Sequence, residues 1–125
     1  MKNNQSKEDY LERFLILQEQ GFKYIRATDI ADSFSFSRAS VSIAMKKLIE
    51  EGLITCDEHQ HLSLTEKGRK IAEEIYLRHK VISTFFISLG VDKDIALEDA
   101  CKIEHDISEE SFKALENFIN KEKQI

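Results

Sequence analysis

Apolar residues recur at helical spacing along most of this chain. In the first such segment, about residues 7–20, Phe14 and Leu17 belong to an apolar stripe, and Gly21 follows as a stop signal. Ser6 precedes the segment and is predicted to be its N-cap. Further helices are predicted over about residues 28–33, 38–51, 66–89, 94–105 and 109–120. The chain is therefore expected to be mainly α-helical.

The second and third predicted helices are separated by a short polar turn, which is the pattern of a helix-turn-helix unit. Ser37 is predicted to be the N-cap of the third helix, in which Val41, Met45 and Leu48 keep helical period. Small side chains at its start let the backbone approach a phosphate, and Arg38 is the best candidate to read a guanine edge. The alternative is an ordinary solvated helix. The candidate DNA-contacting residues are Ser37, Arg38, Ala39, Ser40, Ser42 and Lys46.

Two short strand candidates, residues 53–56 and 62–64, follow this helix with a polar stretch between them. They are expected to pair as a β-hairpin and to form a wing. Cys56, His59 and His61 in this hairpin also suggest a zinc site, which is the alternative interpretation. These three donors lack a fourth partner, so the wing is the favoured interpretation.

The run C-x-x-E-H, from Cys101 to His105, lies inside the predicted helix of residues 94–105. Positions i, i+3 and i+4 share one face of a helix, so the thiol, the carboxylate and the imidazole can converge on one point. Together they offer a divalent metal one sulfur, one oxygen and one nitrogen donor. Three donors from one helix rarely complete a site, so further ligands are expected from elsewhere. Taken alone, Cys101 would more often be a small buried apolar residue.

The composition is that of a helix-rich globular chain: of 125 residues, 42% are hydrophobic and 33% charged, with no proline and no tryptophan. No apolar run reaches the roughly 18–20 residues that a membrane span needs, so we expect a cytoplasmic protein with no membrane partner. In that reducing compartment a structural disulfide is not expected, and each of the only cysteines, Cys56 and Cys101, is expected to be free, buried or metal-bound.

The net charge of −5 is unusual for a protein that binds nucleic acid. Residues 79–125 carry six basic and ten acidic side chains, so most of the acidic excess lies in the last third of the chain. Residues 37–49 contain three basic side chains and no acidic one. A local basic helix on an acidic protein still attracts phosphate, so the net charge does not exclude DNA binding.

Three stretches of the chain resemble the iron- and manganese-dependent repressors of the diphtheria toxin repressor family. They are residues 8–12 (EDYLE), 76–79 (YLRH) and 98–108 (EDACKIEHDIS). Residues 62–68 (LSLTEKG) are similar to the strand that leads into the next helix in that family. The resemblance runs from about Glu8 to Phe118, and the run A-C-x-x-E-H-x-x-S is its most specific part.

The resemblance implies two domains. A winged helix-turn-helix DNA-binding domain with a small hairpin wing is expected over residues 1–75, and an all-helical metal-binding and dimerisation domain over residues 76–125. The length is similar to that of the manganese-responsive branch, which lacks an SH3-like domain. The implied partners are a second copy of the chain and a double-stranded DNA operator, palindromic, with half-sites about one helical turn apart.

The resemblance also implies a metal site at the domain junction. The implied ligands are Asp9, Glu12, His79, Cys101, Glu104 and His105. From the residues alone, helix capping remains an alternative for Asp9, solvation for Glu12 and ordinary packing for His79.

The implied ligand set combines features of two branches of that family. The manganese branch usually has Glu at the position of Cys101, whereas the iron branch has Cys there. The iron branch has Met at the position of Asp9. A bridging Glu is missing, and Ser83 and Leu97 stand where the iron branch has second-site ligands. The number of metal ions and their identity therefore stay open.

We predict a metal-activated transcriptional repressor of metal-uptake genes, and not an enzyme, that responds to Fe(II) or Mn(II). The thiolate of Cys101 is softer than a carboxylate and favours Fe(II), Co(II) or Zn(II), so Zn(II) and Co(II) are possible substitutes. One alternative is a winged-helix regulator with no metal input. Another is a metal-dependent hydrolase, for which the sequence offers no general base beyond the ligands. No small organic substrate is expected.

Overall fold

The computed structural model describes residues 2–34 and 36–123, which fall into two compact units, Met1–Glu73 and Glu74–Ile125. The boundary between the units lies within the long helix α4 (Glu66–Ser88). The sequence places the domain boundary between residues 75 and 76, two residues further along. Each unit has buried apolar residues of its own.

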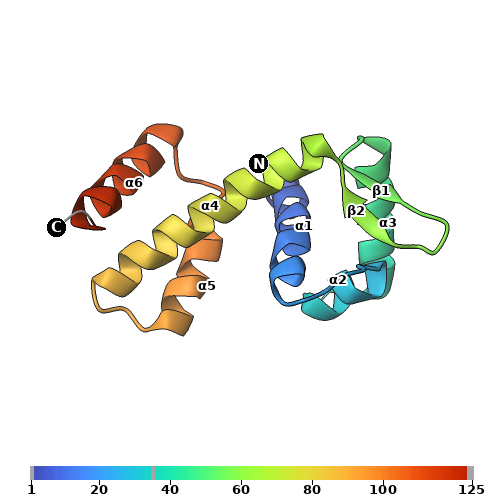
Figure 1. Ribbon diagram of the computed structural model, residues 1–125, viewed down its shortest axis with the longest axis horizontal. Helices are drawn as coiled ribbons and strands as arrows, with labels where there is room; N and C mark the ends of the chain where they lie inside the picture. The colour runs from blue at the N-terminus through green and yellow to red at the C-terminus, as the bar shows by residue number, and fades with distance from the viewer. Residues whose placement is uncertain (1, 35, 124–125) are drawn as a thin grey trace. The chain divides into compact units, whose positions relative to one another are not determined.

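The N-terminal unit contains three helices followed by a hairpin (Figure 1). Its elements are α1 (Lys2–Glu19), α2 (Ala27–Ser33), α3 (Arg38–Glu50), β1 (Ile54–Cys56) and β2 (Leu62–Leu64). The two strands are antiparallel, with Ile54 opposite Leu64. The backbone N–H of Leu62 also donates to the carbonyl of Ile25 at 2.7 Å, which ties the hairpin to the segment that precedes α2.

Each of the helices α1, α2 and α3 buries one face in the core of the N-terminal unit. Leu11 and Phe14 of α1, Ile30 of α2 and Val41 of α3 are completely buried, and Ile54 of β1 joins them. Apolar residues at this spacing bury a single stripe of a helix and leave the opposite stripe in solvent. Helix α3 therefore packs on the core through its apolar face, and its polar face points into solvent.

In the C-terminal unit, α5 (Lys93–Ile103) and α6 (Glu109–Lys123) lie beside the second half of α4 (Figure 1). Ile82 on α4 is buried, as are Ala96 and Ala100, which stand one turn apart on α5. Small residues at that spacing allow a close approach between helices. At the end of α5, Oε2 of Glu104 lies 2.9 Å from Nδ1 of His79 on α4, and this contact joins the two elements.

The structure corrects two local predictions. Helix α1 begins at Lys2, so Ser6 lies inside the helix and is not its N-cap. Helix α5 ends at Ile103, so Glu104 is its C-cap and His105 lies in the following turn. The backbone of Glu104 keeps helical angles (φ −56°, ψ −26°), and its N–H still donates to the carbonyl of Ala100 at 2.9 Å. Helical geometry therefore persists as far as Glu104, which is why its side chain stays near that of Cys101.

Gly68, in the first turn of α4, is packed against backbone. A Cβ atom at this position would lie 2.0 Å from the carbonyl oxygen of Leu53. That carbonyl also accepts a hydrogen bond from the N–H of Thr65 at 3.0 Å, so it is not free to move away. Thr65 caps the same helix, because its hydroxyl accepts from the N–H of Gly68 at 3.1 Å.

Gly68→Ala is expected to lower the free energy of unfolding by about 1–3 kcal/mol, because the added methyl group forces the start of α4 away from the backbone of Leu53, directly before β1. Urea denaturation followed by circular dichroism measures this loss. Lys70→Ala, at an exposed position of the same helix, is the matched control and should change stability by less than about 0.5 kcal/mol. Equal stabilities of the two variants would contradict the packing described above.

None of the helices within residues 2–34 and 36–123 combines the length and the apolar character needed to cross a membrane.

Candidate metal centre and DNA-contacting surface

Three side chains of the C-terminal unit bring nitrogen, sulfur and oxygen donors together. His79 lies on α4, Cys101 on the last turn of α5, and Glu104 at its C-cap. The Nδ1 atom of His79 is 2.9 Å from Oε2 of Glu104 and 3.7 Å from Sγ of Cys101. One donor atom from each residue lies within 4.8 Å of the other two. This group is called the N/S/O cluster below.

His105 contacts the other oxygen of the same carboxylate. Its Nε2 atom is 3.3 Å from Oε1 of Glu104, while Oε2 faces His79. The Glu104 side chain is completely buried and that of His105 is 2% exposed. The turn after α5 therefore places one buried carboxylate between two imidazoles. The prediction from helical spacing was that Cys101, Glu104 and His105 meet at one point; in the structure, Glu104 is the residue that the two histidines share.

Two partners make His79 unusually basic. Hydrogen bonds to the thiol of Cys101 and to the carboxylate of Glu104 raise the pKa of His79 from 6.5 to about 10. The imidazole is therefore protonated at neutral pH in the metal-free protein. Because a metal binds the neutral ring, ligation by His79 has to release that proton.

The raised pKa predicts a pH dependence of stability for the metal-free protein. A group whose pKa is higher in the folded state stabilises fully below its unfolded value, and this contribution is lost as pH rises to the folded value. We therefore expect the stability that His79 provides to be present below pH 6.5 and to disappear progressively up to about pH 10. Thermal melts of wild-type protein and His79→Gln, compared at several pH values with chelator present, measure it. The two melting curves should converge as pH rises; a constant difference would contradict the prediction.

The N/S/O cluster has the spacing that a divalent transition metal requires. Ligand bonds of about 2.0–2.3 Å place two donors on the same ion roughly 3–4 Å apart. The distances of 2.9 and 3.7 Å from His79 Nδ1 to its two neighbours are close to that range. A donor set of imidazole, thiolate and carboxylate suits Fe(II), Co(II) or Zn(II), and the oxygen donor also suits Mn(II).

Two of the six predicted metal-binding residues, Asp9 and Glu12, lie on α1 in the N-terminal unit. Because α1 begins at Lys2, Asp9 is in the third turn of the helix and does not act in a capping box at its start. Glu12 is 3% exposed, so it is not an ordinary solvated side chain. The four other predicted ligands lie together in the C-terminal unit.

The predicted DNA-contacting residues lie on the solvent side of α3. Val41, Met45 and Leu48 are buried, and all six candidates are exposed. Ser37 is the N-cap of α3, as predicted, and its hydroxyl oxygen accepts from the N–H of Ser40 at 3.1 Å. Exposure of a small, basic stripe beside a capped helix start is what docking into a DNA groove requires.

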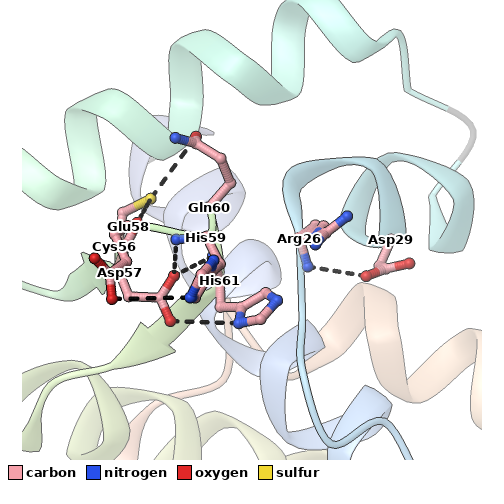
Figure 2. Close-up of polar contacts among 8 residues, drawn as sticks. All are labelled: Arg26, Asp29, Cys56, Asp57, Glu58, His59, Gln60 and His61. Atoms are coloured by element: carbon pink, nitrogen blue, oxygen red, sulfur yellow. Dashed lines mark hydrogen bonds and ion pairs between the residues drawn. The ribbon is translucent and has the colours of Figure 1, made fainter.

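The wing is organised by the side chain of Asp57, which folds back over its own loop (Figure 2). One carboxylate oxygen accepts from the backbone N–H groups of His59, at 2.8 Å, and of His61, at 2.9 Å. The other lies 3.3 Å from Nδ1 of His61, whose ring stacks on Tyr24 with 4.6 Å between centroids. These hydrogen bonds hold the pKa of Asp57 below its ordinary value. Asp57 and Tyr24 thus hold the wing in one conformation.

A cleft of about 620 Å³ lies between the start of α2, α3 and the wing. Its polar and basic lining residues include Arg26, Thr28, Ser42, Lys46, His59 and Gln60.

The zinc site that was the alternative interpretation of the hairpin is not formed. Within residues 2–34 and 36–123, Cys56, His59 and His61 do not form a group of three donors close enough to hold one metal ion.

Two family models cover almost the whole chain. One is described as the N-terminal DNA-binding domain of iron-dependent repressors and matches residues 4–62; the other is their metal-binding and dimerisation domain and matches residues 65–124. An uncharacterized HTH-type transcriptional regulator of Methanocaldococcus jannaschii is 36% identical over 121 residues, which are 96% of this chain and 97% of that protein. The chain belongs to the iron-dependent repressor family.

Solved structures of similar regulators share the fold. The manganese regulator SloR is 35% identical with a TM-score of 0.78, and the match covers 91% of this chain and 53% of that one. A manganese-dependent transcriptional repressor in complex with manganese is 26% identical with a TM-score of 0.83, covering 91% of this chain and 52% of that one. The chain spans about half the length of these solved chains. Its two parts are thus a winged-helix DNA-binding domain and a helical domain for metal binding and dimerisation.

As a member of the iron-dependent repressor family, the chain is a metal-dependent transcriptional regulator and not an enzyme.

The structure also reveals two residues that the sequence did not single out. Ile43 is 68% exposed on α3 in spite of its apolar side chain, and Arg78 binds the turn that carries Glu104. An apolar residue among the polar positions of α3 was a visible signal for Ile43. Arg78 lies within the stretch 76–79 that resembles the repressor family, but local sequence did not show its role, because its partners lie 26–31 residues away.

Proposed function

We propose that this chain acts as a homodimer that represses metal-uptake genes and that Fe(II) or Mn(II) activates it to bind a palindromic DNA operator in the cytoplasm. The observation that carries the proposal is the N/S/O cluster of His79, Cys101 and Glu104 in a domain of the family's metal-binding type. His105 belongs to the proposed site because it shares the Glu104 carboxylate. When bound, the metal supplies positive charge that neutralises the carboxylate and thiolate ligands.

Asp9 and Glu12 are proposed to add oxygen donors from α1. The support is their residue type and the family membership of the whole chain. Oxygen donors would balance the soft thiolate and keep Mn(II) and Fe(II) within the range of the site, with Zn(II) and Co(II) as substitutes.

The DNA partner is proposed to meet the exposed stripe of α3. Arg38 and Lys46 provide the charge, and the small residues Ser37, Ala39, Ser40 and Ser42 allow close approach to the DNA. Ile43, exposed on the same helix, offers an apolar contact for a thymine methyl group. The cleft beside the wing adds basic and hydroxyl groups that suit a phosphate backbone.

The test is a DNA-binding titration under anaerobic conditions with Mn(II), Fe(II), Zn(II) or chelator. The probe is a duplex selected from a random-sequence pool by the Mn(II)-loaded protein, together with a scrambled duplex. Metal is expected to raise affinity for the selected duplex about 5- to 150-fold, the usual range of such coupling. Equal affinity with chelator and with every metal would leave a winged-helix regulator without metal input as the function.

The wing provides a separate prediction about DNA binding. Asp57→Ala and Asp57→Asn remove the same negative charge, but only asparagine keeps an oxygen that can accept from His59 and His61. Each such hydrogen bond contributes about 1 kcal/mol. We therefore expect the alanine variant to bind the selected duplex roughly three- to tenfold more weakly than the asparagine variant, as measured by fluorescence anisotropy at fixed salt. Identical affinities would mean that the wing conformation does not contribute to binding.

A further inference from the structure

Arg78, one residue before His79 on α4, makes three contacts with the segment that follows α5. Its Nη1 donates to the backbone carbonyls of Glu104, at 3.3 Å, and Ile107, at 2.8 Å. Its Nη2 pairs with Oε2 of Glu109 at 2.9 Å. Only 18% of the Arg78 side chain is exposed, and all of these partners belong to the C-terminal unit.

These contacts meet a local structural need. Carbonyl groups at and beyond the end of an α-helix need partners from outside the helix, and the two that Arg78 binds belong to the C-cap Glu104 and to Ile107 in the segment after α5. A guanidinium group supplies several donors in one plane, and its charge is favourable at the C-terminal end of a helix. Arg78 therefore holds this turn to α4 at two points of its backbone.

The proposed metal ligands of the C-terminal unit differ in how they are held in place. His79 and Cys101 lie within regular helices, which position them. Glu104 lies at the end of α5, and its own carbonyl is one that Arg78 binds. His105 lies wholly in the turn.

We propose that Arg78 is a positioning residue for metal binding, which places the carboxylate of Glu104 without touching the metal itself. This inference rests on the proposed metal site. It predicts that loss of Arg78 acts through Glu104 and leaves the contribution of Cys101 unchanged.

The experiment uses Co(II), whose absorption reports both affinity and coordination. Arg78→Met is expected to weaken Co(II) binding about 10- to 100-fold, as loss of groups that orient metal ligands typically does. The absorption band from the Cys101 thiolate should persist, while the bands that report coordination geometry change. In a Glu104→Gln background, Arg78→Met should weaken binding by less than about threefold, because residues that act through one another are not additive.

Three further variants isolate the role of the turn. Lys102→Met removes one exposed positive charge from α5 and should leave Co(II) affinity within about twofold of wild type. Glu109→Gln removes only the ion pair to α6, so binding should stay within about threefold. Arg78→Lys keeps the charge but not the planar group of donors, and should restore part of the affinity. If circular dichroism shows that Arg78→Met has lost its helices, the same comparisons are made with Arg78→Lys.

Additive losses in the double variant, or wild-type Co(II) affinity in Arg78→Met, would overturn the positioning role while leaving the metal site intact. Failure of the wild-type protein itself to bind Co(II) would instead overturn the proposed metal site.

Discussion

A Glu104→Gln variant is expected to lose metal activation of DNA binding, with metal affinity lower than that of wild type by more than about a hundredfold. Glu104 is completely buried, and its two oxygens face His79 at 2.9 Å and His105 at 3.3 Å. Glutamine keeps the shape but not the negative charge, and one of the two histidines then faces an amide N–H group instead of an oxygen. Because this carboxylate serves both imidazoles, its loss should exceed the roughly 10- to 100-fold effect of removing a group that only orients ligands.

The measurement for Glu104 is a Co(II) titration followed by DNA binding with and without Mn(II). Glu98→Gln is the matched control, because Glu98 is exposed on the same helix α5 and carries the same charge. The control should keep its metal response. Glu104→Gln should bind the selected duplex with the weak affinity of the chelated wild type whether metal is added or not. A normal metal response in Glu104→Gln would place the activating metal elsewhere.

Replacing Cys101 is expected to change which metal the protein prefers. The thiol lies 3.7 Å from Nδ1 of His79 and is exposed, so a carboxylate fits the same place without a new buried charge. Thiolates favour Zn(II), and carboxylates suit Mn(II). Cys101→Glu should therefore lower the ratio of Zn(II) to Mn(II) affinity by roughly tenfold or more, a typical size for a change in the coordination shell.

The selectivity of Cys101 variants is measured by competition between metals under anaerobic conditions. Cys56→Ser is the control for the loss of an exposed thiol, because Cys56 lies on the wing in the other unit. Cys101→Ser adds a comparison in which the soft donor is removed and no charge is introduced. An unchanged metal ratio in Cys101→Glu would show that Cys101 is not a ligand.

The apolar pattern was a reliable guide where residues are placed by their own helix. Val41, Met45 and Leu48 were predicted to share a face from their spacing, and they are buried together in α3. Ser37 was predicted to cap that helix and does so. Ser6 failed as a cap because the helix continues through residues that lie before it, and a cap residue acts only where a helix actually begins.

The candidate metal centre was predictable only in part. The spacing of Cys101 and Glu104 brought both into the N/S/O cluster, because helical geometry persists as far as the C-cap. His105 was assigned to the same helical face, but it lies in the turn and contacts the opposite oxygen of Glu104. The end of α5 is set by the contacts of the turn with α4, which local spacing does not describe.

The sequence by itself determined the helices, the hairpin, the exposed face of α3 and the identity of the donors. These features depend on side chains a few residues apart, whose periodicity and capping act within one element. Only the tertiary structure decided that His79 and His105 face opposite oxygens of Glu104, that Arg78 holds the turn beside it, and that Gly68 must lack a side chain. Such contacts depend on how separate elements pack, because each partner is placed by a different helix or turn.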